Sequence, residues 1–369
     1  MSELGETTLE LDLSALEHNY RFLRSKLRPR TKFLAVVKAF AYGSDMQAIA
    51  KKMEALGADA LAVAYVREGL SLREAGLGLP ILVLHPLEVN FGEMIQGRLE
   101  PCLYTHKVLD RFLGKARESG QSGYPIHLKF NTGLNRLGFG PGDVPEIVKK
   151  IKLAPAVELR SVFSHLAASE DPRERGFSLE QIKSFEKMYG TLSGELGHAP
   201  IRHLLNTSGI INYPGAQFDM VRSGIGLYGY GNEPGVDARL KPVASLKTII
   251  SQIHEIGAGQ TVGYNRAFVS QGKIRTATLP LGHADGIGRQ YGQGKASVLI
   301  RGQRAPIIGN VCMDMIMVDV SGIDCREGDE VLVFGPGNSA ENFATCAGTI
   351  PYEILTAISQ RIKRRILGN

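Results

Sequence analysis

The chain has 369 residues, of which 43% are hydrophobic and 22% charged, a composition typical of a globular protein and not of a disordered or fibrous one, and its length suits two domains at roughly 150 residues each. The formal net charge of +6 arises from 43 basic and 37 acidic residues that are interleaved along the chain, which argues against nucleic acid as a partner and suits a small anionic ligand. No apolar run approaches the roughly 18 residues of a transmembrane helix, and four cysteines without a C-x-x-C pair predict neither a metal site nor a disulfide framework.

The first residues, MSELGETTLE, are acidic and polar. They lack the basic and apolar regions of a secretory signal, so we expect a cytoplasmic protein with no membrane partner. From Thr8 to Leu13 apolar and polar residues alternate, which predicts a strand that can belong to either domain.

Eight short apolar runs recur through the first two-thirds of the chain, and all the gaps between them except the last have helical periodicity. In the first gap, Met46, Ile49 and Met53 share one helix face, and Gly57 closes the helix. Buried strands alternating with helices indicate a parallel sheet covered on both faces, and eight units in roughly 240 residues fit a (β/α)₈ barrel. The runs are Phe33 to Val37, Ala60 to Tyr65, Ile81 to Leu84, Cys102 to Tyr104, Ile126 to Phe130, Leu159 to Phe163, His203 to Leu205 and Met220 to Val221.

A turn-rich break at residues 229–235 (GYGNEPG) ends this pattern. Strands then dominate, and Pro351 followed by an apolar stripe of Ile354, Leu355, Ile358 and Ile362 predicts a terminal helix. We therefore predict a barrel domain over residues 1–235, with residues 1–13 assignable to either domain, and a mostly β domain with a terminal helix over residues 236–369. The strands predicted there are Leu246 to Ile253, Arg275 to Leu281, Ala296 to Ile300, Ile316 to Val320 and Glu330 to Phe334.

Polar side chains follow the predicted barrel strands, where the fold places functional groups. Each alone is more often a solvated rim charge or a core histidine. Four cations and a histidine directed at one mouth would repel one another unless an anion or a function compensates. The residues are Lys38 after the first run, Lys129 and Arg136 at the fifth, His165 after the sixth, Asn206 to Ser208 after the seventh and Arg222 at the eighth.

The loops after the seventh and eighth strands are the usual phosphate site of a (β/α)₈ barrel. Here they read NTSG (206–209) and SGIG (223–226), which offer hydroxyls and unhindered backbone N–H groups. Residues 224–229 also match G-x-G-x-x-G, but they lead into turn residues and not into a helix, so we reject a dinucleotide site. A strand-end lysine facing a phosphate cradle predicts a covalent bond to pyridoxal 5′-phosphate (PLP).

The segment AVVKAFAYG around Lys38 resembles the cofactor-lysine motif of alanine racemases, and further matching motifs follow in order over essentially the whole chain. The resemblance implies a fold-type III, PLP-dependent racemase that supplies D-alanine for peptidoglycan and works as a homodimer with shared active sites. The matching segments are LKFNTGLNRLGF (128–139), SH (164–165), HLLNT (203–207), FDMVRSGI (218–225), VGY (262–264), CMD (312–314) and TIPYE (349–353).

Two bases on opposite faces of the substrate Cα are what racemisation needs. By similarity to the family, these are Lys38, which also binds the cofactor, and Tyr264 from the second subunit. On sequence alone, the favoured interpretation of Tyr264 is a buried strand tyrosine with a hydrogen-bonded hydroxyl. A phenol of pKa ~10 needs help near neutral pH, and we expect His165 and Arg222 to act as cations that lower this pKa.

The resemblance also implies the remaining contacts. Arg222 faces the pyridine nitrogen, Arg136 binds the substrate carboxylate or the cofactor phenolate, and Lys129, often carbamylated in the family, organises Arg136. Met313 and Asp314 form a substrate-side loop from the partner, although this segment can equally be core. The cofactor-binding set further comprises Tyr42, His165, Asn206, Thr207, Gly224, Ile225 and Tyr352.

The chain departs from the family pattern at Phe40 (usually Asn), Asn131 (Asp), Leu134 (Met), Ser223 (Pro) and His283 (Tyr). Phe40 and Asn131 put the carbamate in question, and His283 bears on access and substrate breadth. Alanine is the expected substrate, with a serine or broader-specificity racemase as the alternative. Two other hypotheses are a non-catalytic PLP-binding protein, which would not need Tyr264, and a decarboxylase, which Arg222 disfavours.

Overall fold

The computed structural model describes residues 5–368, apart from the side chain of Pro234. Residues 1–4, part of the segment assignable to either domain, and Asn369 lie outside this range. The chain divides into two compact units. The barrel unit comprises Glu17–Ala41 and Met46–Leu240, and the sheet unit comprises the described residues up to Leu16, Tyr42–Asp45 and those from Lys241 onward.

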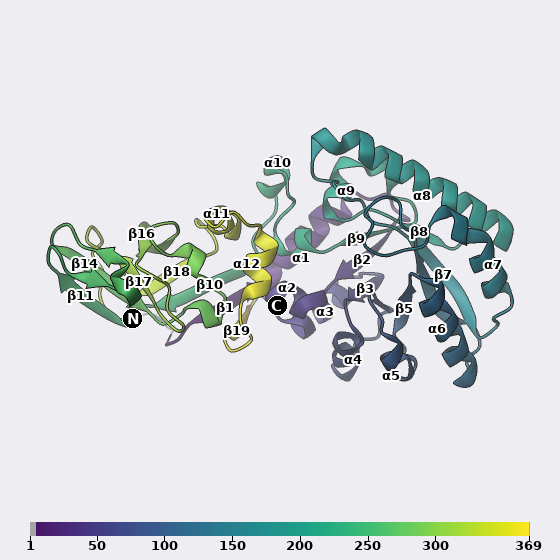
Figure 1. Cartoon of the computed structure of the whole chain (residues 1–369), viewed down its shortest axis with the longest axis horizontal. Helices are drawn as coiled ribbons and strands as arrows, with labels where there is room; N and C mark the ends of the chain where they lie inside the picture. Colours follow the sequence, from purple (N-terminus) through teal and green to yellow (C-terminus); the bar gives the residue numbers. More distant parts are fainter. Residues whose placement is uncertain (1–4, 369) are drawn as a thin grey trace. The chain divides into compact units, whose positions relative to one another are not determined.

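The barrel unit contains the closed eight-stranded barrel that the apolar runs predict, with every neighbouring pair parallel (Figure 1). Most strand residues are buried because helices cover the outer face of the barrel. Its strands are β2 (Lys32–Val36), β3 (Ala60–Val63), β4 (Ile81–Val83), β5 (Glu100–Leu103), β6 (Tyr124–Lys129), β7 (Val157–Phe163), β8 (Ile201–His203) and β9 (Met220–Ser223).

The barrel helices form for the reasons visible in their sequences. In α3, Met46, Ile49 and Met53 are buried on one face, and Gly57 (φ +82°) ends the helix. One helix was missed, because α9 lies in the last gap, where Asn206 caps it by accepting a hydrogen bond from the Gly209 N–H. The helices are α1 (Leu13–Arg24), α3 (Met46–Ala55), α4 (Val66–Glu74), α5 (Phe91–Gln96), α6 (His106–Glu118), α7 (Val144–Lys152), α8 (Arg175–Leu196), α9 (Thr207–Asn212) and α10 (Pro234–Asp237).

The sheet unit contains a nine-stranded sheet of order β11-β14-β17-β16-β15-β18-β10-β1-β19. Strand β1 (Thr8–Asp12) belongs here: it pairs with β10 antiparallel and with β19 parallel (Figure 1). The other elements are β10 (Ala244–Ile249), β11 (Gln252–Ile256), β14 (Ile274–Leu279), β15 (Ser297–Ile300), β16 (Gln303–Ile308), β17 (Ile316–Asp319), β18 (Glu330–Phe334), β19 (Lys363–Leu367), the hairpin β12 (Thr261–Val262) and β13 (Phe268–Val269), and helices α11 (Ala340–Thr345) and α12 (Pro351–Ala357).

Two of the elements predicted in the sheet unit differ from expectation, and β16, β19 and α11 were not predicted. The run from Leu246 to Ile253 forms two strands, because β10 pairs with β18 and β11 pairs with β14. The predicted terminal helix ends at Ala357, since Ile358 is extended (ψ 114°) and Arg364 donates hydrogen bonds to the carbonyls of Ile358 and Ile362. Strand β19 then follows, so Ile362 is not part of the helical stripe.

Candidate active site

The C-terminal ends of the barrel strands bring together the cations singled out in the sequence. Lys38 follows β2, Lys129 ends β6, His165 follows β7 and Arg222 lies in β9. The four groups and Arg136 are close enough for each to influence the ionisation of others in the set. The predicted cluster at one mouth of the barrel is therefore present in the structure.

Lys38 is a partly buried amine. Burial lowers its pKa, and Arg136 lowers it further, while Glu68 acts in the opposite direction. A lowered pKa increases the neutral, nucleophilic fraction of the amine, as a bond to an aldehyde requires.

A left-handed turn follows Lys38. In α2 (Lys38–Gly43), the non-glycine residues Ala39, Phe40, Ala41 and Tyr42 have φ of 53°, 53°, 54° and 56°. Each such residue costs about 1–2 kcal/mol, so surrounding contacts must hold the turn. One of them is the Glu68 carboxylate, which accepts a 2.6 Å hydrogen bond from the Ala39 N–H.

Glu68 was missed in the sequence analysis. Its other oxygen accepts the N–H groups of Ala64 and Tyr65, so one carboxylate joins the start of α4 to the residue after Lys38. An available signal was its place at the third position of α4, where glutamate often closes a capping box.

Arg222 is buried on β9 and surrounded by acceptors. Its guanidinium donates to the carbonyls of Ser164 (2.7 Å) and Leu204 (3.0 Å). It also donates to Nδ1 of His203 (2.8 Å) and Nδ1 of His165 (3.1 Å). Burial lowers its pKa to about 10, so Arg222 stays cationic at neutral pH.

The structure corrects the expected charge of His165. Burial, followed by the charges of Arg222 and the nearby lysines and Arg136, brings the pKa of His165 well below its usual value of 6.5. Because Nδ1 accepts from Arg222, the proton of the neutral ring lies on Nε2. His165 is therefore not a cation that lowers a neighbouring pKa, but a neutral donor through Nε2–H.

Thr207 and Ser223 form the centre of the predicted phosphate cradle. Their hydroxyl oxygens lie 2.9 Å apart, and Thr207 Oγ1 also accepts the Gly226 N–H at 3.2 Å. Within the described residues, the backbone N–H groups of Gly224 and Ile225 have no protein acceptor. Two hydroxyls and two free N–H groups are the donors that a phosphate needs.

Lys129 is almost fully buried and has no carboxylate partner between residues 5 and 368. Burial lowers its pKa to about 8; the nearby Cys102 opposes this shift, and the cations Arg222, Arg136 and Lys38 add to it. Its ammonium lies over the ring of Phe163, 5.6 Å from the centroid. An amine with this pKa is substantially neutral near pH 8, which a reaction with carbon dioxide would require.

The loop that carries Arg136 is organised by Asn131. The Asn131 side-chain oxygen accepts the N–H groups of Gly133 and Asn135, and its amide donates to the Asn135 side chain. This departure from the family pattern therefore has a local role as a turn residue. Arg136 itself is exposed.

The remaining candidates lie in the sheet unit. The rings of Tyr42 and Tyr352 are 5.9 Å apart, and burial raises the pKa of Tyr42. Tyr264 lies in the turn between β12 and β13 with 71% of its surface exposed, which excludes a buried strand tyrosine within this chain. Met313 is 59% exposed, so it is not a core residue of the chain.

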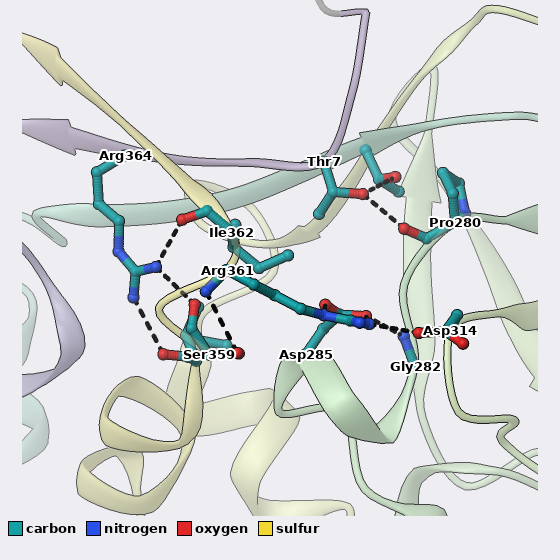
Figure 2. A network of polar contacts seen from close by, with 11 residues as sticks. Thr7, Pro280, Gly282, Asp285, Asp314, Ser359, Arg361, Ile362 and Arg364 are labelled. Carbon is teal, nitrogen blue, oxygen red and sulfur yellow. Dashed lines mark hydrogen bonds and ion pairs between the residues drawn. The ribbon is translucent and has the colours of Figure 1, made fainter.

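Asp314 is anchored in the network that Figure 2 shows. Arg361 contacts both the buried Asp285 (2.7 Å) and Asp314 (2.6 Å). The neighbouring backbone adds two bonds, from the His283 N–H to the Cys312 carbonyl and from Ala284 to Met313. Residues 312–314 therefore have a fixed support, which the sequence did not reveal.

The family models give a direct comparison. Residues 11–232 match the model described as alanine racemase, N-terminal domain, and residues 243–366 match alanine racemase, C-terminal domain. In the part of the chain that the structure describes, no helix is long and apolar enough to span a membrane.

Individual relatives match over the full length. An alanine racemase of Syntrophobacter fumaroxidans is 36% identical over 367 residues, covering 97% of this chain and 96% of that protein. The solved alanine racemase of the D-cycloserine producer Streptomyces lavendulae has a TM-score of 0.93 at 31% identity and covers 100% of this chain and 98% of that one. An alanine racemase of Bartonella henselae with covalently bound pyridoxal phosphate has a TM-score of 0.90 at 29% identity, with 99% and 100% coverage.

Proposed function

The chain belongs to the alanine racemase family, whose members use PLP to interconvert L-alanine and D-alanine, and we propose the residue roles by which it performs this reaction. The alternatives of a non-catalytic PLP-binding protein, a decarboxylase or a broader racemase are not favoured, because named alanine racemases match both units.

The donor set of the barrel unit fits the cofactor. The Thr207 and Ser223 hydroxyls and the free N–H groups of Gly224 and Ile225 suit its phosphate, and the partly buried Lys38 amine suits its aldehyde. By the family resemblance, Tyr42, Asn206 and Tyr352 also serve the cofactor, and Arg222 directs a guanidinium N–H at the ring nitrogen. When bound, the cofactor withdraws electrons from the substrate Cα and makes its proton acidic.

The chain's own residues then move the proton. The Lys38 Nζ takes or returns it on one face of Cα, and the Tyr264 hydroxyl of a partner copy does so on the other face. His165, as a neutral Nε2–H donor, stabilises the phenolate form of that tyrosine by a hydrogen bond. Arg136 binds the substrate carboxylate with its fork of donors, and Lys129, as the carbamate, supplies the anion that orients Arg136.

Exposure in the sheet unit supports a homodimer. Tyr264, Met313 and Met315 are 71%, 59% and 49% exposed, although large apolar side chains are usually buried. We propose that a second copy covers them, and that Met313 and Asp314 line the substrate site of that copy. We also propose that the dimer works in the cytoplasm and supplies D-alanine for peptidoglycan.

The observation that carries the proposal is the Lys38 amine on the same barrel as the Thr207–Ser223 cradle. The test is proton exchange at Cα in deuterated water with PLP-loaded protein and each alanine enantiomer. We expect deuterium to enter both enantiomers. Tyr264→Phe should keep the absorbance of the bound cofactor and lose most racemisation, and unchanged racemisation would refute the role of Tyr264.

A further inference from the structure

A row of buried polar side chains crosses the interior of the barrel from Arg222 to a carboxylate. Its members, hereafter the polar chain, come from five consecutive strands and are at most 8% exposed. Isolated polar groups at such depth are costly, so their bonds must be accounted for. They are Glu100 on β5, His127 on β6, Ser161 on β7, His203 on β8 and Arg222 on β9.

Each member of the polar chain contacts the next. Arg222 Nη1 lies 2.8 Å from His203 Nδ1, and His203 Nε2 lies 2.9 Å from Ser161 Oγ. Ser161 Oγ lies 2.5 Å from His127 Nδ1, and His127 Nε2 lies 2.7 Å from the Glu100 carboxylate. The barrel register places His127 directly beside Ser161.

The two ends fix the direction of every hydrogen bond. A guanidinium only donates, so His203 Nδ1 accepts and its proton lies on Nε2, where it is donated to Ser161. At the other end the carboxylate accepts from His127 Nε2–H, which leaves His127 Nδ1 to accept the Ser161 hydroxyl proton. If His127 were an imidazolium, the buried Ser161 hydroxyl would have no acceptor among the described residues.

Glu100 supplies a negative charge that Arg222 lacks locally. Among residues 5–368, the acceptors of Arg222 are two carbonyls and two imidazoles, and none is a carboxylate. Burial is the largest single influence and acts to raise the pKa of Glu100, but the hydrogen bond and charge of His127, together with the charges of Arg160 and Arg73, outweigh it and lower the pKa. A cation at one end and an anion at the other polarise the bonds between them in one sense.

We propose that Ser161, His127 and Glu100 are positioning residues of the racemase reaction, which hold His203 in its Nε2–H form so that its Nδ1 fixes the Arg222 guanidinium in one orientation. The inference rests on the proposed role of Arg222 at the cofactor ring nitrogen. If the polar chain is interrupted by removal of the Ser161 hydroxyl, His203 can adopt the Nδ1–H form. Two donors then face each other, and the guanidinium must move.

The first test is nitrogen NMR of the unaltered full-length protein, labelled in its histidines, before and after PLP loading. We expect His127 and His203 to show one protonated nitrogen, Nε2, and one bare nitrogen, Nδ1, in both states. An imidazolium or an Nδ1–H ring at either position near neutral pH would overturn the proposal. This readout does not require racemisation. An inactive protein would refute the proposed function, whereas the protonation of His127 and His203 would still test the polar chain.

The second test compares Ser161→Ala with Ser178→Ala, which removes another buried hydroxyl of the barrel unit that is not in the polar chain. We expect Ser161→Ala to change the His203 signals and to lower kcat about tenfold with little change in KM, because removing a hydrogen-bond partner that orients an active-site group typically costs about this factor in rate. Ser178→Ala should change neither. Equal kcat values in the two variants, with His203 unchanged, would overturn the proposal.

Glu100→Gln separates charge from hydrogen bonding. The amide keeps an oxygen for His127 Nε2–H but removes the negative charge at the end of the polar chain. We expect the His203 form to persist while kcat falls severalfold. A kcat equal to that of the unaltered protein would show that Glu100 is not the counter-charge of Arg222.

Discussion

Nη2 of Arg222 lies 3.1 Å from Nδ1 of His165, so the arginine donates and the imidazole accepts. A protonated His165 would place two donors against each other beside a buried cation. Both this contact and burial keep His165 neutral, and His203 is held neutral in the same way. The consequence is a pH dependence of folding.

We predict that the free energy of unfolding falls as the pH drops below 6.5. An unfolded histidine titrates near 6.5, whereas the folded pKa values of His165 and His203 lie well below it, so acid favours the unfolded state. Each such group contributes a slope of about 1.4 kcal/mol per pH unit in this window, and none above it. The free energy of unfolding should be measured by denaturant from pH 5 to 8. In His165→Gln its slope against pH below 6.5 should be smaller by about 1.4 kcal/mol per pH unit, which corresponds to one proton. The control His198→Gln, at an exposed position, should keep the slope of the unaltered protein.

Gly226→Ala should weaken cofactor binding. A Cβ at this position would lie 2.5 Å from Thr207 Cγ2 and 3.2 Å from its Oγ1, so the threonine must move and its hydroxyl leaves the phosphate cradle. We expect the Kd for PLP, measured by absorbance titration, to rise at least tenfold, which corresponds to about 1.4 kcal/mol. Gly215→Ala is the control, because its Cβ meets nothing within 4 Å. Equal affinities in the two variants would contradict the assignment of the cradle.

Glu68→Gln should change the reactivity of Lys38. The Glu68 charge raises the pKa of Lys38, so its removal should lower that pKa and shift PLP attachment toward lower pH. The same variant loosens the Ala39 N–H bond that holds the left-handed turn. The measurement is the rate of cofactor attachment against pH.

Glu54→Gln is a matched control for Glu68→Gln. Glu54 also accepts two backbone N–H groups, those of Gly78 and Leu79, but it is not among the groups that influence Lys38. A shared loss of folding stability would reflect the backbone bonds alone. If the pH profile of attachment moved equally in both variants, Glu68 would have no specific influence on Lys38.

Arg361→Met should loosen the loop at residues 312–314. The arginine joins Asp314 to the buried Asp285, and without it Asp314 loses its ion pair and Asp285 keeps, among the described residues, only the Gly282 N–H. Because Met313 and Asp314 are proposed to line the substrate site of a partner copy, we expect the KM for alanine to rise severalfold while cofactor absorbance is unchanged. Arg326→Met, which removes an exposed arginine paired with Asp329, is the control. A KM equal to that of the control would separate this loop from the substrate site.

Much of the barrel was predictable because its signals are local. Each strand is a short apolar run such as Ile81–Val83, and most of the helices between them, such as α3, have an apolar stripe of their own. The sheet unit was less predictable, since partners such as Thr8 and Lys363 are far apart in sequence, and nothing local marks β19 as a strand beside β1. The apolar stripe after Pro351 predicted a longer helix than α12. Local periodicity cannot show that residues 363–367 have a strand partner in β1.

In the candidate site, too, residues with a local sequence signal could be predicted and those that depend on distant partners could not. Lys38, Lys129, His165 and Arg222 could be found because each lies at or near the C-terminal end of a strand whose position the sequence reveals. The polar chain could not, because its members lie on five separate strands and are brought into one hydrogen-bonded row only when the barrel closes. The left-handed turn after Lys38 was also hidden, since four consecutive non-glycine residues with positive φ have no compositional signature.

Strand β1 lies between β10 and β19 in the sheet. During translation, residues 8–12 therefore leave the ribosome before the whole barrel, and their parallel partner, residues 363–367, is made only after it. The barrel strands can pair among themselves while β1 still has both edges open to other chains. We therefore expect the sheet unit to be completed only after residues 363–367 have been synthesised, later than the barrel strands can pair.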